Sequence, residues 1–186
     1  MNRHLILALV LTLALCIPLC AQVADSLAYG KVAPEHGFLE RLSGRWNTSV
    51  RLWPSAADTH AVAASGRSVT HMALGGRYLV EEDTMSVPDK SYLTLAILGF
   101  DNLKHKYVET WMDNRSTGLL ELTGAVNDSG DVLTMQGERM DPKGGKSKMS
   151  FIYHSLNGNF RTLEIWETRG TGKPRRTLEL VYTRAK

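Results

Sequence analysis

Short runs of alternating apolar and polar residues fill the chain from residue 45 to its end. The runs are rich in Val, Thr, Tyr, Trp and Leu, and their period of two is that of β-strands with one buried face. Gly, Pro, Asn and Asp interrupt them about every 10 to 15 residues, without any long helical period. The pattern predicts about ten strands, over residues 45–53, 67–74, 77–85, 92–101, 106–113, 118–127, 132–140, 148–155, 160–169 and 176–184.

One helical pattern precedes the strands. Phe38, Leu39 and Leu42 fall on one face of a short helix that begins near Pro34 and ends before Gly44. Proline in the first turn and glycine after the last turn are common at helix ends. We expect this N-terminal helix to plug one end of the domain that the strands form.

Turn residues connect each predicted strand directly to the next. The Gly75-Gly76 pair, for example, can supply the positive φ angles of a two-residue hairpin turn. Such a meander can close into a barrel or form a sandwich, but a sandwich usually needs long crossing connections, and the one candidate is residues 54–65. A closed barrel also leaves no strand edge to protect. The pattern therefore favours an all-β fold, an up-and-down antiparallel β-barrel of about ten strands.

The first residues carry a processing signal. A positive start at Arg3 precedes an apolar run at residues 5–15, which is too short to cross a bilayer because a spanning helix takes roughly 20 residues. Cleavage is expected near Ala21, so Cys16 and Cys20 leave with the signal, and the mature chain has no disulfide and no cysteine metal site. The predicted organisation is a signal peptide at 1–21, a flexible leader at 22–33 and a single β-barrel domain at 34–186. These features predict a secreted or periplasmic protein.

The charge of the chain is close to balanced. The sequence has 22 Lys and Arg residues against 19 Asp and Glu residues, a formal net charge of +3. Its one basic cluster, residues 173–176, is typical of a solvated hairpin tip. We therefore expect no nucleic-acid partner and no transmembrane segment, and the oligomeric state stays open.

Gly44-Arg45-Trp46 opens the first predicted strand, and Arg184 closes the last one. The tripeptide resembles the Gly-x-Trp signature of the calycin barrels, the group that includes lipocalins and fatty-acid-binding proteins. The resemblance implies that Arg184 packs across Trp46 at the closed end of a calycin-like, lipocalin-like barrel. A guanidinium stacked on an indole ring is worth roughly 0.5 to 2 kcal/mol and keeps hydrogen-bond donors for nearby carbonyls.

A wider resemblance covers most of the chain between residues 36 and 184. The residues that carry it are His36, Phe38-Leu39, Leu42 to Trp46, Leu74 to Leu79, Leu98 to Asn102, Tyr107, Trp111 to Asn114 and Ser116 to Gly118. In these residues the chain is similar to a bacterial family known only as domain of unknown function 1579. The resemblance implies a calycin-like barrel, secretion in many members and no assigned reaction. The family often has Tyr where Phe100 stands, a departure that removes one hydroxyl.

The predicted strand at 106–113 carries the densest group of candidate functional residues. Tyr107, Glu109, Trp111 and Asp113 share one face of it by the period of two. If this face points into the barrel, aromatic walls and carboxylates could bind a small polar or cationic ligand. If it points outward, the residues between them line the interior and the carboxylates are solvated. The sequence leaves both orientations open.

Three further residues are candidates for ligand binding. Glu164 and Trp166 alternate in the same way on a later strand and would join an inward-facing site. Arg77 follows a glycine pair near the expected rim of the barrel, where it could attract a carboxylate or pair with Glu81 or Glu82 across strands.

Three functions remain open on the sequence alone. The histidines are dispersed without metal-ligand spacing, so we expect no metal and no cofactor. The first hypothesis is a protein that binds a small, partly apolar molecule of unknown identity. The second is an enzyme that uses Glu109, Asp113 or Glu164 for proton transfer, and the third is a filled barrel that acts as an envelope interaction protein. Barrels of about eight strands can be filled by side chains, whereas about ten strands usually leave room for a ligand.

Overall fold

The computed structural model describes residues 29–55, 57–87, 90–140 and 144–186. The predicted signal peptide at 1–21 lies outside the described residues, and so does the predicted leader up to residue 28. Residues 33–186 form one compact unit, and residues 1–32 are assigned to a separate one. The larger unit holds all ten strands and the helix α2.

The elements of this unit follow one another in the predicted order. The helix α2 spans His36–Leu42. The strands are β1 (Gly44–Leu52), β2 (Val62–Ala73), β3 (Tyr78–Val87), β4 (Lys90–Asp101), β5 (Lys106–Asp113), β6 (Leu120–Val126), β7 (Val132–Met140), β8 (Lys146–Asn157), β9 (Phe160–Arg169) and β10 (Arg175–Arg184).

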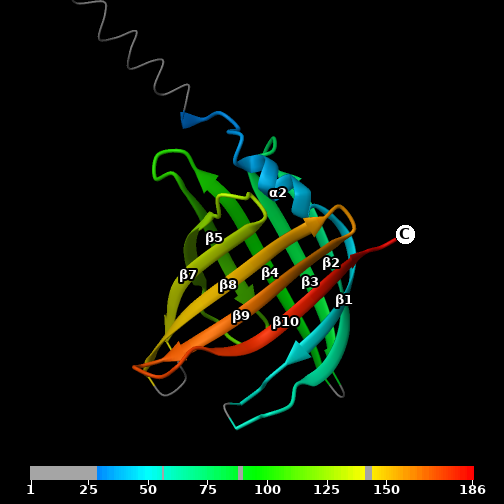
Figure 1. The fold of residues 1–186 in the computed structure, drawn as a ribbon, viewed down its shortest axis with the longest axis vertical. Helices are drawn as coiled ribbons and strands as arrows, with labels where there is room; N and C mark the ends of the chain where they lie inside the picture. The colour runs from blue at the N-terminus through cyan, green and yellow to red at the C-terminus, as the bar shows by residue number, and fades with distance from the viewer. Residues whose placement is uncertain (1–28, 56, 88–89, 141–143) are drawn as a thin grey trace, which may run out of the picture. The chain divides into compact units, whose positions relative to one another are not determined.

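The strands form a closed antiparallel barrel in which each strand pairs with its neighbours along the chain (Figure 1). The first strand, β1, pairs with the last, β10, and this pairing closes the sheet on itself. Closure gives the edges of β1 and β10 the hydrogen-bond partners that an open sheet would leave to solvent. The structure therefore confirms the prediction of an all-β, up-and-down antiparallel barrel with one short helix before it.

The strand β2 departs most from its predicted bounds, because it begins at Val62 and not at residue 67. The segment from Val62 to Gly66 pairs with residues Leu52 to Thr48 of β1. The small side chains of this segment give a weak hydrophobic signal. At Gly66 the close approach of β3 requires a glycine, because an added Cβ atom would lie 2.1 Å from the backbone oxygen of Thr84. The connection that suggested a sandwich crossing is therefore partly strand.

The helix α2 closes one end of the barrel (Figure 1). Phe38, Leu39 and Leu42 are buried on its inner face, as the helical pattern predicted. The Tyr107 hydroxyl of β5 donates a hydrogen bond to the backbone carbonyl of Glu35 at 2.8 Å, just before the helix. Apolar packing and this hydrogen bond thus hold the helix on the strand ends.

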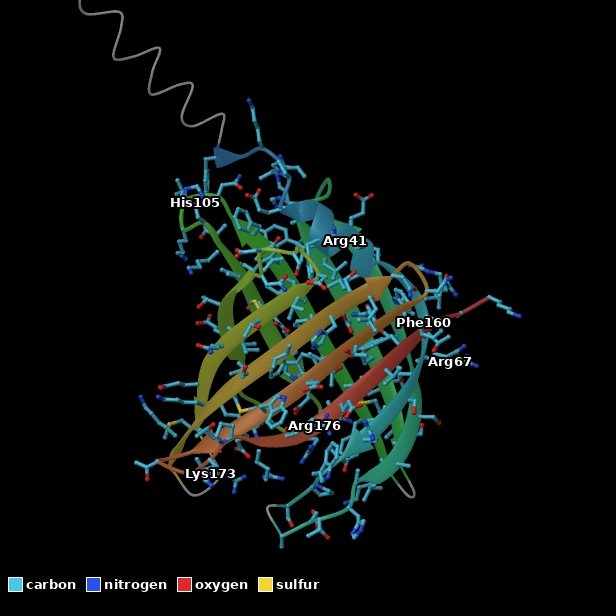
Figure 2. The ribbon with its side chains drawn as sticks, in the orientation of Figure 1. Arg41, Arg67, His105, Phe160, Lys173 and Arg176 are labelled. Atoms are coloured by element: carbon cyan, nitrogen blue, oxygen red, sulfur yellow. The ribbon has the colours of Figure 1, made fainter. Side chains whose placement is uncertain are left out.

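The two ends of the barrel differ in what covers them. Arg41 on α2 marks the closed end, whereas the β9–β10 hairpin that carries Lys173 lies at the other end (Figure 2). Within the part of the chain that the structure describes, no helix has the length and apolar character needed to cross a membrane. Among the described residues, the helix covers the end where α2 lies and leaves the other end to hairpin connections.

Candidate functional site

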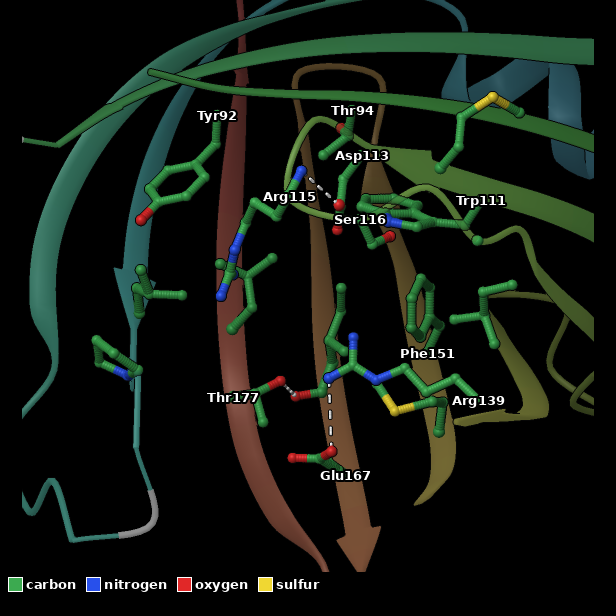
Figure 3. Close-up of a pocket in the computed structure, with 18 of the residues that line it drawn as sticks. Tyr92, Thr94, Trp111, Asp113, Arg115, Ser116, Arg139, Phe151, Glu167 and Thr177 are labelled. Atoms are coloured by element: carbon green, nitrogen blue, oxygen red, sulfur yellow. Dashed lines mark hydrogen bonds and ion pairs between the residues drawn. The ribbon is translucent and has the colours of Figure 1, made fainter. Parts of the chain in front are cut away.

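A cavity of about 790 Å³ lies inside the barrel, toward the end opposite α2 (Figure 3). Its position follows from the direction of the strands, because Tyr107 at the start of β5 meets the α2 end while Trp111 and Asp113, farther along the strand, line the cavity. The volume lies in the range of small-molecule sites, about 300 to 1,000 Å³. The barrel is therefore not filled throughout by its own side chains.

Aromatic and aliphatic side chains form the walls of the cavity. Trp111 of β5 and Phe151 of β8 meet edge to face, with their ring centroids 5.2 Å apart at an interplanar angle of 84°. Met149, Ile165 and Leu178 continue this wall on β8, β9 and β10. These positions come from the inward face of each strand by the period of two. The walls suit the apolar part of a ligand.

Charged side chains line the mouth of the cavity, which is its end away from α2. They gather around one buried carboxylate, Glu167. Arg139, Arg169 and Arg175 each place a guanidinium nitrogen near it, at 3.4, 3.2 and 3.6 Å. Burial raises the pKa of Glu167, but the contact with Arg169 and the charge of Arg139 outweigh it and hold this pKa below its usual value. Glu167 is thus an anion that holds three arginines in place.

Another arginine reaches the cavity from the connection between β5 and β6. The guanidinium of Arg115 lies 5.1 Å from the ring centroid of Tyr92, within cation–π range (Figure 3). Its backbone N–H donates a hydrogen bond to the Asp113 carboxylate at 2.9 Å, which fixes the turn. Among the described residues no carboxylate forms an ion pair with Arg115.

A buried carboxyl group lies behind the cavity wall. Thr94 of β4 lines the cavity, and its hydroxyl donates a hydrogen bond to Asp83 of β3 at 3.1 Å. Burial, followed by the negative charge of Glu81, raises the pKa of Asp83 to about 8. Burial therefore favours the neutral form of Asp83, which is linked to the cavity wall by the Thr94 hydroxyl.

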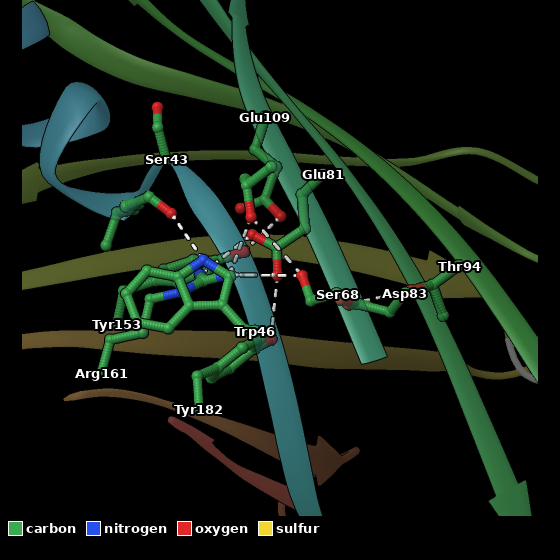
Figure 4. A network of polar contacts seen from close by, with 12 residues as sticks. Ser43, Trp46, Ser68, Glu81, Asp83, Thr94, Glu109, Tyr153, Arg161 and Tyr182 are labelled. Atoms are coloured by element: carbon green, nitrogen blue, oxygen red, sulfur yellow. Dashed lines mark hydrogen bonds and ion pairs between the residues drawn. The ribbon is translucent and has the colours of Figure 1, made fainter. Parts of the chain in front are cut away.

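Between the cavity and α2, the barrel interior holds a polar core around Arg161 of β9 (Figure 4). This guanidinium is bidentate on Glu81 of β3, with nitrogen–oxygen distances of 3.0 and 3.1 Å, and it also donates to the Thr70 hydroxyl at 3.2 Å. The Tyr182 ring lies 3.7 Å from its central carbon, and the Tyr182 hydroxyl donates to Glu81 at 2.9 Å. The side chains of Arg161 and Glu81 are each only 2% exposed. Loss of either partner would leave the other charge buried without a counter-charge, which destabilises a folded protein.

A second carboxylic acid, Glu109 of β5, lies in the same core. The Tyr153 hydroxyl donates to one of its oxygens at 2.6 Å, while the other oxygen has no hydrogen-bond partner among the described residues. Burial raises the pKa of Glu109 to about 8, more than the Tyr153 hydrogen bond lowers it. Burial also raises the pKa of Tyr153, so that its hydroxyl remains a donor. Glu109 is thus a neutral acid in the core.

Trp46 and Arg184 lie opposite each other where β1 pairs with β10. The Arg184 guanidinium is centred 4.3 Å from the Trp46 ring, and it donates to the backbone carbonyl of Ser43 at 3.3 Å. A Cβ atom at Gly44 would lie 2.3 Å from an Arg184 nitrogen, which explains the glycine two residues before the tryptophan. Arg161 approaches the same ring at 5.1 Å from the barrel interior. The indole therefore contacts two guanidinium groups.

The structure settles the orientation of β5, which the sequence left open. Tyr107, Glu109 and Trp111 are buried in the barrel interior, and Asp113 follows on the same inward face. They do not form one site, because Tyr107 packs at the α2 end and Glu109 lies in the polar core. Trp111 and Asp113 line the cavity.

The prediction that Glu164 and Trp166 join the interior is wrong. The buried positions on β9 are the residues between and around them, so both point to the outer face of the barrel. There the Trp166 indole donates to Glu164 at 2.8 Å, and Arg176 lies 3.4 Å from the same carboxylate. The alternation was visible in the sequence, but Ile165 rather than Trp166 proved to be the inward member.

Arg77 lies at the α2 end of the barrel and does not line the cavity. Its side chain is exposed and donates to the backbone carbonyl of Leu74 at 3.2 Å. Glu81, one of the two carboxylates predicted as its partners, is buried and binds Arg161. The glycine pair has positive φ angles, 67° at Gly75 and 84° at Gly76, but the connection between β2 and β3 has four residues, 74–77, and not the predicted two.

The sequence patterns did not predict the arginines of the mouth or the polar core. One signal was present: Glu81 and Asp83 alternate with Leu79 and Met85 on β3, and all four are buried. A carboxylate on the buried face of a strand needs a hydrogen-bond donor or a positive charge beside it. The two carboxylates therefore indicate a buried cation elsewhere in the chain. Within the described residues, no group of three or more His, Cys, Asp or Glu side chains could hold a metal ion.

Comparison with known proteins adds a family and a fold. A family model described as protein of unknown function (DUF1579) matches residues 31–184. No curated protein matches the chain. Among solved structures, the chain is similar to one titled "Crystal Structure of Rv2717c from M. tuberculosis", with 15% sequence identity and a TM-score of 0.59, over 84% of this chain and 100% of that chain. A likeness at this identity shows the fold alone.

Proposed function

Because the chain belongs to the family described as protein of unknown function (DUF1579), whose description names no activity, we propose its function from the cavity. The protein binds a small, partly apolar molecule inside the barrel, at the end away from α2. It does so outside the cytoplasm, in the periplasm or the extracellular medium. This second part of the proposal depends on the apolar run at residues 5–15 and its positive start.

The observation that carries the proposal is the cavity of about 790 Å³ with walls of Trp111, Phe151 and Ile165. Filling such a space with side chains would stabilise a barrel, since each Å² of apolar surface removed from water is worth about 25 cal/mol. A barrel that served only as a surface for other proteins would have no use for an apolar interior that opens at one end. An apolar ligand packs against these walls when it binds and so offsets the cost of the cavity.

The test uses N-phenyl-1-naphthylamine, an uncharged probe whose fluorescence rises in apolar surroundings. Ala64 of β2 lines the cavity, whereas its neighbour Ala63 is exposed on the outer face of the barrel. We expect Ala64→Trp to fill the cavity and weaken probe binding at least about 10-fold, which is the loss of about one buried aromatic contact. Ala63→Trp should bind the probe like the wild type. Equal binding by both variants would show that the probe lies elsewhere and that the cavity is not the site.

The compartment is tested separately. Full-length protein expressed in its host should be recovered outside the cytoplasm with an N-terminus near residue 22. Recovery from the cytoplasm with residues 1–21 still attached would contradict the compartment without affecting the binding proposal.

A further inference from the structure

Four arginines line the mouth of the cavity: Arg115, Arg139, Arg169 and Arg175. They come from separate parts of the chain, namely the β5–β6 connection, β7, the end of β9 and the start of β10. Because a barrel brings the ends of distant strands into one ring, these residues meet although they are far apart in sequence. Figure 3 shows Arg115 and Arg139 on the two sides of the opening.

The carboxylates at the mouth do not balance this positive charge. Glu167 is the shared partner of three of the arginines, at 3.2 to 3.6 Å. Glu138, which also lines the cavity, lies 3.6 Å from Lys146, and the Asp113 carboxylate accepts the backbone N–H of Arg115. Among the described residues that line the cavity, these four arginines stand against three carboxylates, Asp113, Glu138 and Glu167, so the net charge of this lining is +1. The mouth therefore has a small excess of positive charge above an apolar interior.

The arginines are held in position but still accessible. The side chain of Glu167 is 2% exposed, whereas those of Arg139 and Arg169 are 45% and 60% exposed. The buried carboxylate anchors one side of the Arg139 and Arg169 guanidinium groups and leaves their other N–H donors to solvent or a ligand, whereas Arg175 also donates to the backbone carbonyls of Trp53 and Ser55. Arg115 rests on the Tyr92 ring 5.1 Å away, which limits its motion without using its donors. This arrangement lowers the entropy lost when an anion binds.

We propose that this arginine cluster binds the phosphate group of an amphiphile whose apolar tail occupies the cavity, an inference that depends on the proposed function. A phosphate monoester carries close to two negative charges at neutral pH and presents three acceptor oxygens. Guanidinium groups bind such oxygens in pairs of parallel hydrogen bonds. The three acceptor oxygens of a phosphate can engage more of the guanidinium groups at the mouth than the two oxygens of a carboxylate can. The tail then runs inward along Trp111 and Phe151.

The experiment compares three compounds by isothermal titration calorimetry: octyl phosphate, octanol and inorganic phosphate. The first two share the tail, and the first and third share the phosphate. We expect octyl phosphate to bind at least about 10-fold more tightly than either of the others, because hydrogen bonds to charged groups add to the burial of the tail. The preference over octanol should decrease at high salt, since the mouth is open to solvent.

Variants identify the residues. Arg115→Gln with Arg139→Gln should remove most of the preference for octyl phosphate over octanol and leave octanol binding unchanged. The control, Arg45→Gln with Arg67→Gln, removes the same charge from exposed positions away from the cavity and should keep the preference; Arg67 is labelled in Figure 2. Arg115→Gln alone breaks no ion pair with a described residue, so it provides a folded variant if the double variant is unstable.

The outcomes separate this inference from the proposed function. If octanol binds as tightly as octyl phosphate, the phosphate site is wrong while binding in the cavity stands. If inorganic phosphate binds as tightly as octyl phosphate, the mouth takes free phosphate and the amphiphile is wrong. If none of the three compounds and no uncharged probe binds, both proposals are wrong. Equal loss of preference in the control variant would attribute the effect to overall charge and would also contradict the site.

Discussion

Glu109→Gln tests whether the polar core contains a neutral carboxylic acid. Glutamine has nearly the same shape and keeps an oxygen that can accept the Tyr153 hydroxyl, which lies 2.6 Å away in the wild type. It cannot ionise, so the variant differs from the wild type mainly in its response to pH. The wild-type pKa of Glu109 is raised by burial to about 8 from a usual value of 4.5.

The sign of the effect follows from proton linkage. Between about pH 4.5 and 8 the folded wild type keeps the Glu109 proton while the unfolded chain releases it, so the free energy of unfolding falls as pH rises. Each pKa unit is worth about 1.4 kcal/mol, so the wild type loses at most about 5 kcal/mol relative to Glu109→Gln across this window. The variant should be no more stable than the wild type near pH 5 and clearly more stable above pH 8.

Urea unfolding followed by far-ultraviolet circular dichroism measures this difference at several pH values between about 5 and 8.5. Urea is uncharged and does not screen the electrostatic interactions. Glu121→Gln on the exposed face of the neighbouring strand β6 is the matched control, and its stability relative to the wild type should not change with pH. A difference between Glu109→Gln and the wild type that stays constant over the whole range would refute a neutral Glu109 in the folded protein.

Three further substitutions test other parts of the barrel. Arg161→Met leaves the buried Glu81 carboxylate without its partner and should lower the free energy of unfolding by about 3 to 5 kcal/mol. Adding Glu81→Leu should restore stability, and a double-mutant cycle in urea measures the loss and the recovery. Arg184→Gln removes the cation–π contact with Trp46 and should cost about 0.5 to 2 kcal/mol, and an unchanged unfolding midpoint would argue against the contact. Gly124→Ala places a Cβ atom 2.0 Å from a backbone oxygen of β7 and should cost about 1 to 3 kcal/mol, visible as a lower melting temperature.

Much of the fold follows from local sequence patterns. The alternation on β5, β7 and β9 predicted strands with the same bounds as those in the structure, 106–113, 132–140 and 160–169. Strand propensity, turn residues and a period of two are properties of neighbouring residues, so they can be read without knowing the rest of the chain. For β2 the signal failed at residues 62–66, because small side chains pair with β1 through their backbone and bury little apolar surface.

The candidate site shows where the sequence alone was insufficient. The period of two groups Glu164 with Trp166 and Arg161 with Ile165, but it does not say which group faces inward. That choice is made by the whole barrel, because the face that packs against the other strands becomes the interior. On β9 the inward face is the one with Arg161 and Glu167, because Arg161 finds Glu81 on β3 and Glu167 finds Arg139 on β7 and Arg175 on β10. Between these two charges β9 supplies Leu163 and Ile165.

The sequence by itself determined the strands, their order, the short helix and the family to which the chain belongs. The tertiary structure decided which faces point inward, and it placed Glu81 beside Arg161 and three arginines around Glu167. The physical reason is that hydrogen bonding between consecutive strands is local, whereas side chains that meet across the interior depend on closure of the sheet and on the stagger between all of its strands.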